Sequence, residues 1–453
     1  MGGGHDRPKM TDGTDGGAAA ATSSDARARA MTPAVGGERL VPVPDDVARE
    51  YLLLALRLEQ RVPGLVDGYF GPANLKAQVD MESLAAPARL AGDAVRLRER
   101  LATEVSDPGR RRWLDRQLVA LEAQARVQAG ESIGYLDMVE RLFDFRPARR
   151  PDETFTEAGR ELDRLLSGDG SLSERMARWD DAFTIRPERL PAVCEWLVGG
   201  FRERAERLFG LPAGEGLTIG FVRNQPWSGY NWYDGGLRSR VDLNLDLPVR
   251  AADLVHIVAH ETYPGHHLEH AWKEADLVLT QGRSESSVLL INTPECLISE
   301  GLADLGHRFA SPTADEPALL EELFARAGLP IAGDLAAARD AAETSARVAA
   351  VRRDLGAVAV NAALLRHADG QSHDDVLAYL IEVGRMDPER AGKRLAFIEH
   401  PTWRTYVFVY TEGEALLRQW LEVGPANDEP TRFARLLHEA PTPSGVAEEI
   451  DQG

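Results

Sequence analysis

Hydrophobic residues recur along most of the chain at the three- and four-residue spacing of amphipathic helices. In the stretch 43–62, Tyr51, Leu54, Leu58 and Val62 fall on one face of such a helix, and a turn-like Pro-Asp-Asp opens it. Glycine and proline separate further segments with the same pattern: 83–105, 109–129, 154–167, 187–209, 313–328, 335–367, 374–383 and 401–422. The pattern predicts a mainly α-helical protein.

One region departs from this helical rhythm. Residues 217–222 are β-like, and apolar residues of 238–248 alternate strictly with polar ones. The apolar members of the alternation are Val241, Leu243, Leu245 and Leu247. Such alternation is typical of a half-buried strand. We expect a small β-sheet next to the histidine-rich segment that follows, with 225–236 as an aromatic loop.

Composition supports a globular body. The chain has 453 residues, of which 43% are hydrophobic and 27% are charged, so a substantial core is expected. Residues 1–38 are rich in Gly, Ala, Asp, Ser and Arg and predict a disordered N-terminal tail. We expect 39–453 to form a single helical unit, with a helical N-terminal part (39–210) and a catalytic part (211–453).

Net charge and cysteine content limit the expected binding partners and the expected cellular compartment. The net charge is −20, and no basic patch with interleaved aromatics interrupts it, so no nucleic-acid partner is expected. Two cysteines, Cys194 and Cys296, lie far apart and indicate a reducing compartment. No apolar run could span a bilayer, and the first residues lack a secretory apolar region. These features predict a cytoplasmic protein without membrane contact, whose oligomeric state stays open.

Candidate chemistry concentrates in AHETYPGHHLEH, residues 259–270. Five of the eleven histidines lie between 256 and 270, and Glu261 directly follows His260. Such a cluster is more typical of a metal site than of a polar helix face. The segment begins like the H-E-x-x-H zinc signature, but its fifth position is Pro264.

Helix geometry makes this departure informative. His266 follows His260 by about 600° of rotation, on the opposite face of an unbroken helix. His267 returns to the same face but lies ~10 Å further along the axis, too far to share one ion. Pro264 lacks an N–H group, and Gly265 can adopt backbone conformations closed to other residues. We therefore expect a break at Pro264-Gly265 that brings His266 beside His260.

Two other histidine pairs have the simple spacing of four residues. They are His256 with His260, and His266 with His270. The first pair is the main competitor, and the second would leave Glu261 a turn and a half away. The pair His260 and His266 is our first prediction.

The segment HETYPGHH resembles the H-E-x-x-P-G-H motif of the bacterial family catalogued as domain of unknown function 885. That family is similar to the gluzincin class of zinc metallopeptidases. The resemblance extends to LEQRVPGLVDGYFGP (58–72), which looks like the family's opening segment, and to ISEGLADLG (298–306), which looks like its second motif. The chain departs from the family at Glu269, where Gln is frequent, and at Leu302, where Trp is frequent.

The resemblance implies roles for individual residues. His260, His266 and Glu300 would be the zinc ligands, and Glu261 would be the general base. Two imidazoles and one carboxylate leave an open position for water, as in catalytic zinc sites, although other divalent ions also accept such ligands. Asp304, one helical turn past Glu300, is a candidate to orient a metal-bound imidazole.

Substrate-binding groups are also suggested. In gluzincins, the strand that corresponds to VDLNLDL (241–247) is an edge that pairs with an extended peptide. Tyr230, Trp232 and Tyr233 are candidates to line a pocket or to belong to the core. RTYVFVYTEG (404–413) resembles a tyrosine-glycine segment of the family, and Tyr410 is the predicted donor to the carbonyl oxygen, ahead of Tyr406 and His400.

These features predict a zinc-dependent hydrolase that acts on a peptide. The first alternative is a metal-dependent hydrolase of a small amide or ester. The second is a non-catalytic descendant that binds a peptide or partner. Nucleophile-elbow, phosphate-loop and dinucleotide motifs are absent from the sequence, so no organic cofactor is expected.

Overall fold

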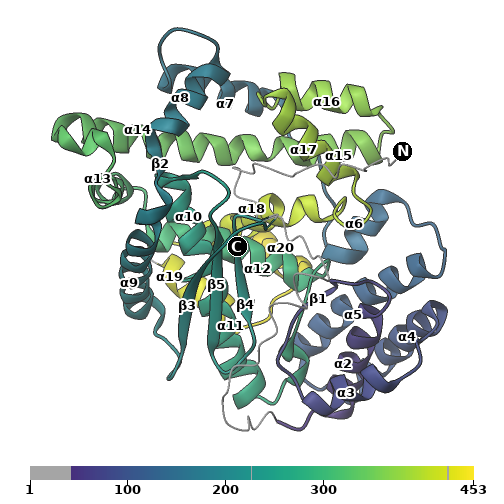
Figure 1. The fold of residues 1–453 in the computed structure, drawn as a ribbon. Helices are drawn as coiled ribbons and strands as arrows, with labels where there is room; N and C mark the ends of the chain where they lie inside the picture. The colour runs from purple at the N-terminus through teal and green to yellow at the C-terminus, as the bar shows by residue number, and fades with distance from the viewer. Residues whose placement is uncertain (1–41, 226, 426–427, 453) are drawn as a thin grey trace, which may run out of the picture.

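A computed structural model describes residues 42–225, 227–425 and 428–452 (Figure 1). It is 67% helix and 7% strand, which confirms the prediction of a mainly α-helical protein with small sheets. The predicted tail, 1–38, lies outside the described residues. In the described ranges, no helix combines the length and the apolar content that crossing a membrane requires.

Helices on both sides of the small sheet form most of the molecule (Figure 1). Those before the sheet are α2 (Asp46–Glu59), α3 (Ala73–Met81), α4 (Pro87–Glu104), α5 (Pro108–Gln128), α6 (Tyr135–Phe143), α7 (Asp152–Leu165), α8 (Leu172–Phe183) and α9 (Leu190–Phe209). Those after the sheet are α10 (Ala251–Glu261), α11 (His266–Lys273), α12 (Pro294–Ala310), α13 (Glu316–Ala327), α14 (Leu335–Gly356), α15 (Val358–His367), α16 (His373–Glu382), α17 (Pro388–Glu399), α18 (Val409–Glu422), α19 (Glu429–His438) and α20 (Pro443–Gln452). Short 3₁₀ or π segments are η1 (Pro187–Arg189), η2 (Glu274–Thr280), η3 (Ser284–Ser287), η4 (Pro330–Gly333) and η5 (Tyr406–Phe408).

Local signals explain where several helices begin. The side chain of Asp107 accepts a hydrogen bond from the backbone of Arg110, and Pro108 occupies the first position of α5. Ser171 and Glu174 form a reciprocal capping box at the start of α8. Such caps satisfy N–H groups that lack partners within the first helical turn.

The small sheet has the order β3-β5-β4, with β3 (Gly216–Val222), β4 (Gly229–Tyr233) and β5 (Arg238–Asn244). β5 pairs in parallel with β3 and antiparallel with β4. The expectation that VDLNLDL forms an edge is therefore wrong, because its residues 241–244 belong to β5, the central strand. β4, which the sequence suggested as part of a loop, is an edge of this sheet instead.

Burial along β5 also differs from the predicted alternation. Asp242 and Asn244 are buried along with their apolar neighbours. Asp242 accepts a hydrogen bond of 2.9 Å from the indole of Trp232, and the Asn244 amide donates to the backbone of Gln225. Partners from neighbouring segments thus allow polar residues to occupy the face that was predicted to be exposed.

Two short strand pairs connect distant parts of the chain. β1 (Val66–Tyr69) runs antiparallel to β7 (Val288–Leu290), and β2 (Thr184–Ile185) runs antiparallel to β6 (Val249–Arg250). The first pair holds the early segment 66–69 beside the chain that leads into α12. In the second pair, β6 leads directly into α10.

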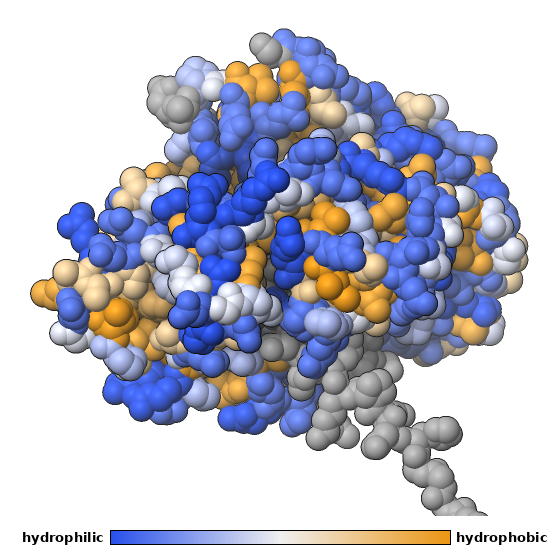
Figure 2. All heavy atoms as spheres, turned by 90° about the horizontal axis from the view of Figure 1, so that it is seen from above, coloured by the Kyte–Doolittle hydropathy of each residue, from blue (hydrophilic) through white to orange (hydrophobic). Residues whose placement is uncertain are grey.

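Four apolar clusters form the core of the described residues, and three of them are large. The first joins α9, α10, α12, α13, α18 and α19, and the second joins α6, α7, η5 and α14–α17. The third joins α2–α5 to β1 and β7. The clusters join chain segments on both sides of position 210. Figure 2 shows mostly hydrophilic side chains on one outer face, with apolar groups scattered between them.

Helices α12 and α18 approach each other at two glycines. A Cβ atom on Gly301 would lie 2.3 Å from the backbone carbon of Gly413. Only glycine at this crossing lets the two backbones come so close. The contact matters for the site because Gly301 follows Glu300, and α18 carries Tyr410.

Candidate metal site

The helix is interrupted between His260 and His266, as Pro264-Gly265 predicted. α10 ends at Glu261 and α11 begins at His266. The N–H group of Gly265 donates to the carbonyl of Ala259 at 3.1 Å, and a Cβ atom on Gly265 would lie 1.9 Å from the carbonyl oxygen of His260. The backbone therefore folds back on the end of α10, and the two imidazole centroids lie 4.7 Å apart.

Glu215 contacts residues on both sides of Pro264-Gly265. Its Oε2 atom accepts hydrogen bonds from the hydroxyl of Tyr263 at 2.5 Å and from Nε2 of His267 at 2.9 Å. Nδ1 of His267 lies 2.8 Å from the hydroxyl of Ser239. His267 is thus fully engaged, and its partners lie in and before the small sheet.

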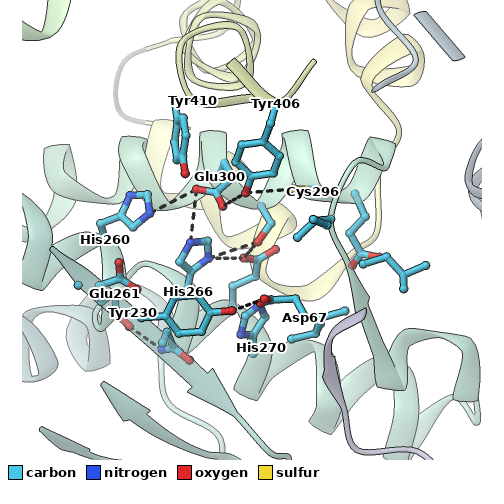
Figure 3. A pocket seen from close by; sticks show the side chains of 18 residues that line it. Asp67, Tyr230, His260, Glu261, His266, His270, Cys296, Glu300, Tyr406 and Tyr410 are labelled. Carbon is cyan, nitrogen blue, oxygen red and sulfur yellow. Dashed lines mark hydrogen bonds and ion pairs between the residues drawn. The ribbon is translucent and has the colours of Figure 1, made fainter. Parts of the chain in front are cut away.

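Glu300 lies between the two histidines (Figure 3). Its Oε2 atom is 3.4 Å from Nε2 of His260 and 3.6 Å from Nε2 of His266. This Oε2 atom is buried and has no hydrogen-bond partner, while Oε1 accepts a hydrogen bond of 2.9 Å from Tyr406. The donor atoms of the three residues lie within 4.8 Å of one another, close enough to surround one ion.

Both imidazoles are oriented through their other nitrogen. Nδ1 of His260 lies 2.9 Å from Oδ1 of Asp304, and a carboxylate can only accept, so this nitrogen carries the proton. Nδ1 of His266 lies 3.3 Å from the hydroxyl of Ser299, which donates its own proton to Glu269 at 2.6 Å. Each Nε2 atom therefore faces Glu300, as expected for ligands held by outer partners.

Two alternative groups are also close enough to hold an ion. One comprises His256, His260 and Asp304, and the other comprises His266, Glu269 and His270. In the first, the same oxygen of Asp304 already faces a nitrogen of each histidine. In the second, both carboxylate oxygens of Glu269 are bonded, one to Ser299 and one to Lys273. Oε2 of Glu300 faces its two histidines at longer distances and makes no hydrogen bond, which favours the first-predicted set.

Electrostatics make this site attractive to cations. Burial alone would lower the pKa of His266, but Glu269 and Glu300 raise it to about 10. Burial also opposes the charge on His260, yet Asp304 and Glu300 hold its pKa well above the usual range. Burial would raise the pKa of Glu300, but the nearby imidazoles of His260 and His266 hold it well below the usual range. The carboxylates therefore draw in positive charge, which protons or a metal ion can supply.

Glu261 lies beside these groups as the last residue of α10. It is buried and lines the same cavity. Burial raises the pKa of its carboxyl, although His260 and His266 oppose the shift. A buried carboxyl with a raised pKa, next to His260 and His266, is a candidate for a general base.

Three of the four predicted tyrosines line the cavity, and the fourth does not. Tyr406 and Tyr410 line the cavity above Glu300 (Figure 3), whereas His400 is exposed and does not line it. Tyr230 also lines the cavity, and its hydroxyl donates to Asp67. Tyr233 is buried, and its hydroxyl donates to Glu274.

The cavity has a volume of about 90 Å³ and is rich in acidic groups. Sequence reasoning missed several of its members: Asp67, Glu269, Glu295 and Ser299. Asp67 belongs to the segment 58–72 that resembles the family's opening segment, so this resemblance could have indicated that Asp67 belongs to the site. Its arrival at the cavity depends on the pairing of β1 with β7.

The comparisons with known proteins give only distant likenesses. No family model matches the chain, and no curated protein matches it. One similar structure is a "putative lipoprotein from Colwellia psychrerythraea", with 12% identity, a TM-score of 0.44, and coverage of 91% of this chain and 77% of that chain. Another is described as "The Structure of CHT", with 11% identity, a TM-score of 0.45, and coverage of 90% and 94%.

Proposed function

We propose that the chain is a zinc-dependent hydrolase of gluzincin type that acts on peptides or similar amides. The observation that carries this proposal is the arrangement around Glu300. Nε2 atoms of His260 and His266 face its Oε2 atom, a buried oxygen without a hydrogen-bond partner. A buried carboxylate oxygen that makes no hydrogen bond is costly, and a cation between the three donors would remove that cost.

The donor set fits zinc. Two imidazole nitrogens and one carboxylate are the ligands of several catalytic zinc sites, and they leave one position open. Zinc held there would act as a Lewis acid and lower the pKa of water to about 7. The resemblance to domain of unknown function 885 suggests the same three ligands and is part of the proposal.

The surrounding side chains supply the remaining functions. Glu261 would take a proton from water, for which its burial and raised pKa are suitable. Tyr410 lines the wall above Glu300 and would donate a hydrogen bond to the carbonyl oxygen as negative charge develops there. Tyr406 already donates to Glu300, so we assign it to holding that side chain.

The edge strand β4 supports a peptide substrate. Gly229, Tyr230 and Asn231 of this strand line the cavity, and β4 pairs with β5 along its other side. An extended peptide could add to this edge through main-chain hydrogen bonds. The small cavity favours a second candidate, in which the substrate is a small amide or ester, because about 90 Å³ admits only a short group.

Location is inferred from the cysteines. Cys194 and Cys296 are both free and buried, as expected for small apolar residues in a reducing compartment. We infer a cytoplasmic protein.

The test compares the wild type with Glu261→Gln and with Glu153→Gln, a control at an exposed position of α7. Zinc content and hydrolysis are measured on peptides of increasing length and on small amides and esters. We expect Glu261→Gln to retain zinc and to lose about 10²–10⁴ in kcat, because the proton acceptor is removed. Control and wild type should be equally active.

The outcomes separate the candidates. Hydrolysis of longer peptides supports the first, and hydrolysis confined to small amides or esters supports the second. If the zinc-loaded wild type hydrolyses none of these substrates, the result would favour the alternative of a non-catalytic protein that binds a peptide or partner. Full activity of Glu261→Gln would exclude Glu261 as the base.

A further inference from the structure

A second cavity, of about 60 Å³, borders the metal site without belonging to it. It shares Tyr410 with the first cavity, and Asp304, which contacts His260, forms part of its wall. Its other polar lining residues are His256, Arg352, Arg353, Arg394, Thr411 and Glu414. α14 and α17 bring the three arginines together from separate parts of the chain.

The cavity is lined by several positively charged side chains, although the whole protein has a negative net charge. The chain has 72 Asp and Glu against 52 Lys and Arg, yet three guanidinium groups meet here. The two acidic lining residues already have cationic or imidazole partners. Asp304 faces His256 and His260, and Glu414 pairs with Arg418. The cavity lining therefore holds three guanidinium groups and two carboxylates, and both carboxylates have other partners.

Several polar atoms at this cavity lack partners. Arg352 is only 9% exposed, and while its Nη1 atom pairs with Asp180 at 2.8 Å, its Nε and Nη2 atoms have no hydrogen-bond partner. The hydroxyl of Thr411 and Nδ1 of His256 are also buried without a partner. A buried charged donor without an acceptor is costly, so this arrangement calls for an acceptor in the cavity.

We infer that this cavity binds a compact oxyanion, either a carboxylate or a phosphate group. A guanidinium fork matches the oxygens of both groups, and three arginines around a small cavity favour negative charge. The volume suits such a group. Because Tyr410 lines both cavities and Asp304 contacts His260, the bound anion lies against two residues that connect it to the metal site.

The inference does not depend on hydrolytic activity, and direct binding tests it. The full-length protein is titrated with inorganic phosphate and, separately, with acetate by calorimetry at low ionic strength. The variants are Arg353→Gln and Arg394→Gln, both at half-buried positions. The control is Arg390→Gln, which lies on the same helix as Arg394 but lines a different cavity. Circular dichroism checks the fold of each variant.

We expect saturable binding of at least one anion to the wild type and to the control, and at least about tenfold weaker binding to each of the other variants. Tighter phosphate binding would identify a phosphate-type ligand, and tighter acetate binding a carboxylate. His266→Ala should still bind the anion, which separates this site from the metal site. Absence of saturable binding of either anion, or binding that neither Arg353→Gln nor Arg394→Gln weakens, would overturn the inference.

Discussion

Oδ1 of Asp304 lies 2.9 Å from Nδ1 of His260, at the side of the imidazole away from Glu300. The contact fixes which nitrogen of His260 is protonated and directs Nε2 at the proposed zinc position. Asp304→Asn keeps the shape but removes the charge, so we expect zinc affinity to fall about 10–100-fold. Competition with a chromophoric chelator measures this affinity.

An exposed aspartate provides the control for that substitution. Asp340→Asn, on α14, should bind zinc like the wild type. Equal zinc affinity in Asp304→Asn and the wild type would show that Asp304 does not support the site.

The two cavity tyrosines should respond differently to the loss of their hydroxyls. Tyr406→Phe removes the hydrogen bond to Oε1 of Glu300, so we expect weaker zinc binding, by about tenfold. Tyr410→Phe should leave zinc content unchanged and lower kcat by about 10²–10³, because a donor to the developing oxyanion is removed. Paired measurements of zinc affinity and kcat check the assignment, which would fail if Tyr410→Phe were fully active.

Gly265→Ala tests the interruption between α10 and α11. The added Cβ would lie 1.9 Å from the backbone oxygen of His260, which cannot move without moving this candidate ligand. We expect a loss of about 1–3 kcal/mol of stability or more, together with a loss of zinc. Gly199→Ala in α9 is the matched control, because its added Cβ would meet no atom within 4 Å apart from its chain neighbours and the backbone of its own helix, and alanine favours helix. Unchanged melting and zinc content in Gly265→Ala would contradict the account of this turn.

Glu215 should contribute to stability in acid. Burial would raise the pKa of its carboxyl, but His267, Tyr263 and Arg202 lower it to about 2 from an ordinary value of 4.5. Because the folded-state pKa lies below the unfolded-state pKa, this contribution is complete above pH 4.5 and is lost as the pH falls towards 2. Glu215→Gln should be less stable at neutral pH and should lose less stability over this acid range. Urea unfolding at pH 7 and at acidic pH measures the difference, and equal pH slopes in both proteins would exclude the contribution.

Much of the helical architecture could be predicted from local patterns. The segment 109–129 corresponds closely to α5, because its apolar spacing coincides with a capping aspartate and proline at its start. The predicted helix 335–367 is divided at Ala357, where α14 ends and α15 begins. The strand 238–248 ends at Asn244, because Leu245 and the residues after it turn towards β6.

Part of the candidate site was also predictable, because several of its residues lie close together in the sequence. His260, Glu261 and His266 lie within seven residues, so the stereochemistry of Pro264-Gly265 was enough to indicate that the helix breaks. Asp67 and the three arginines of the second cavity could not be anticipated, because long-range pairing and helix packing bring them into place. The edge position of β4 also depends on pairing between strands, which alternation within one strand does not encode.

Metal content tests the central claim most directly. Zinc per chain is measured by plasma mass spectrometry for the wild type, His266→Ala and His400→Ala, whose histidine is exposed and outside the cavity. We predict about one zinc ion in the wild type and in His400→Ala, and strong loss in a folded His266→Ala. Zinc retained in His266→Ala, or absent from all three proteins, would contradict a site built from His260, His266 and Glu300.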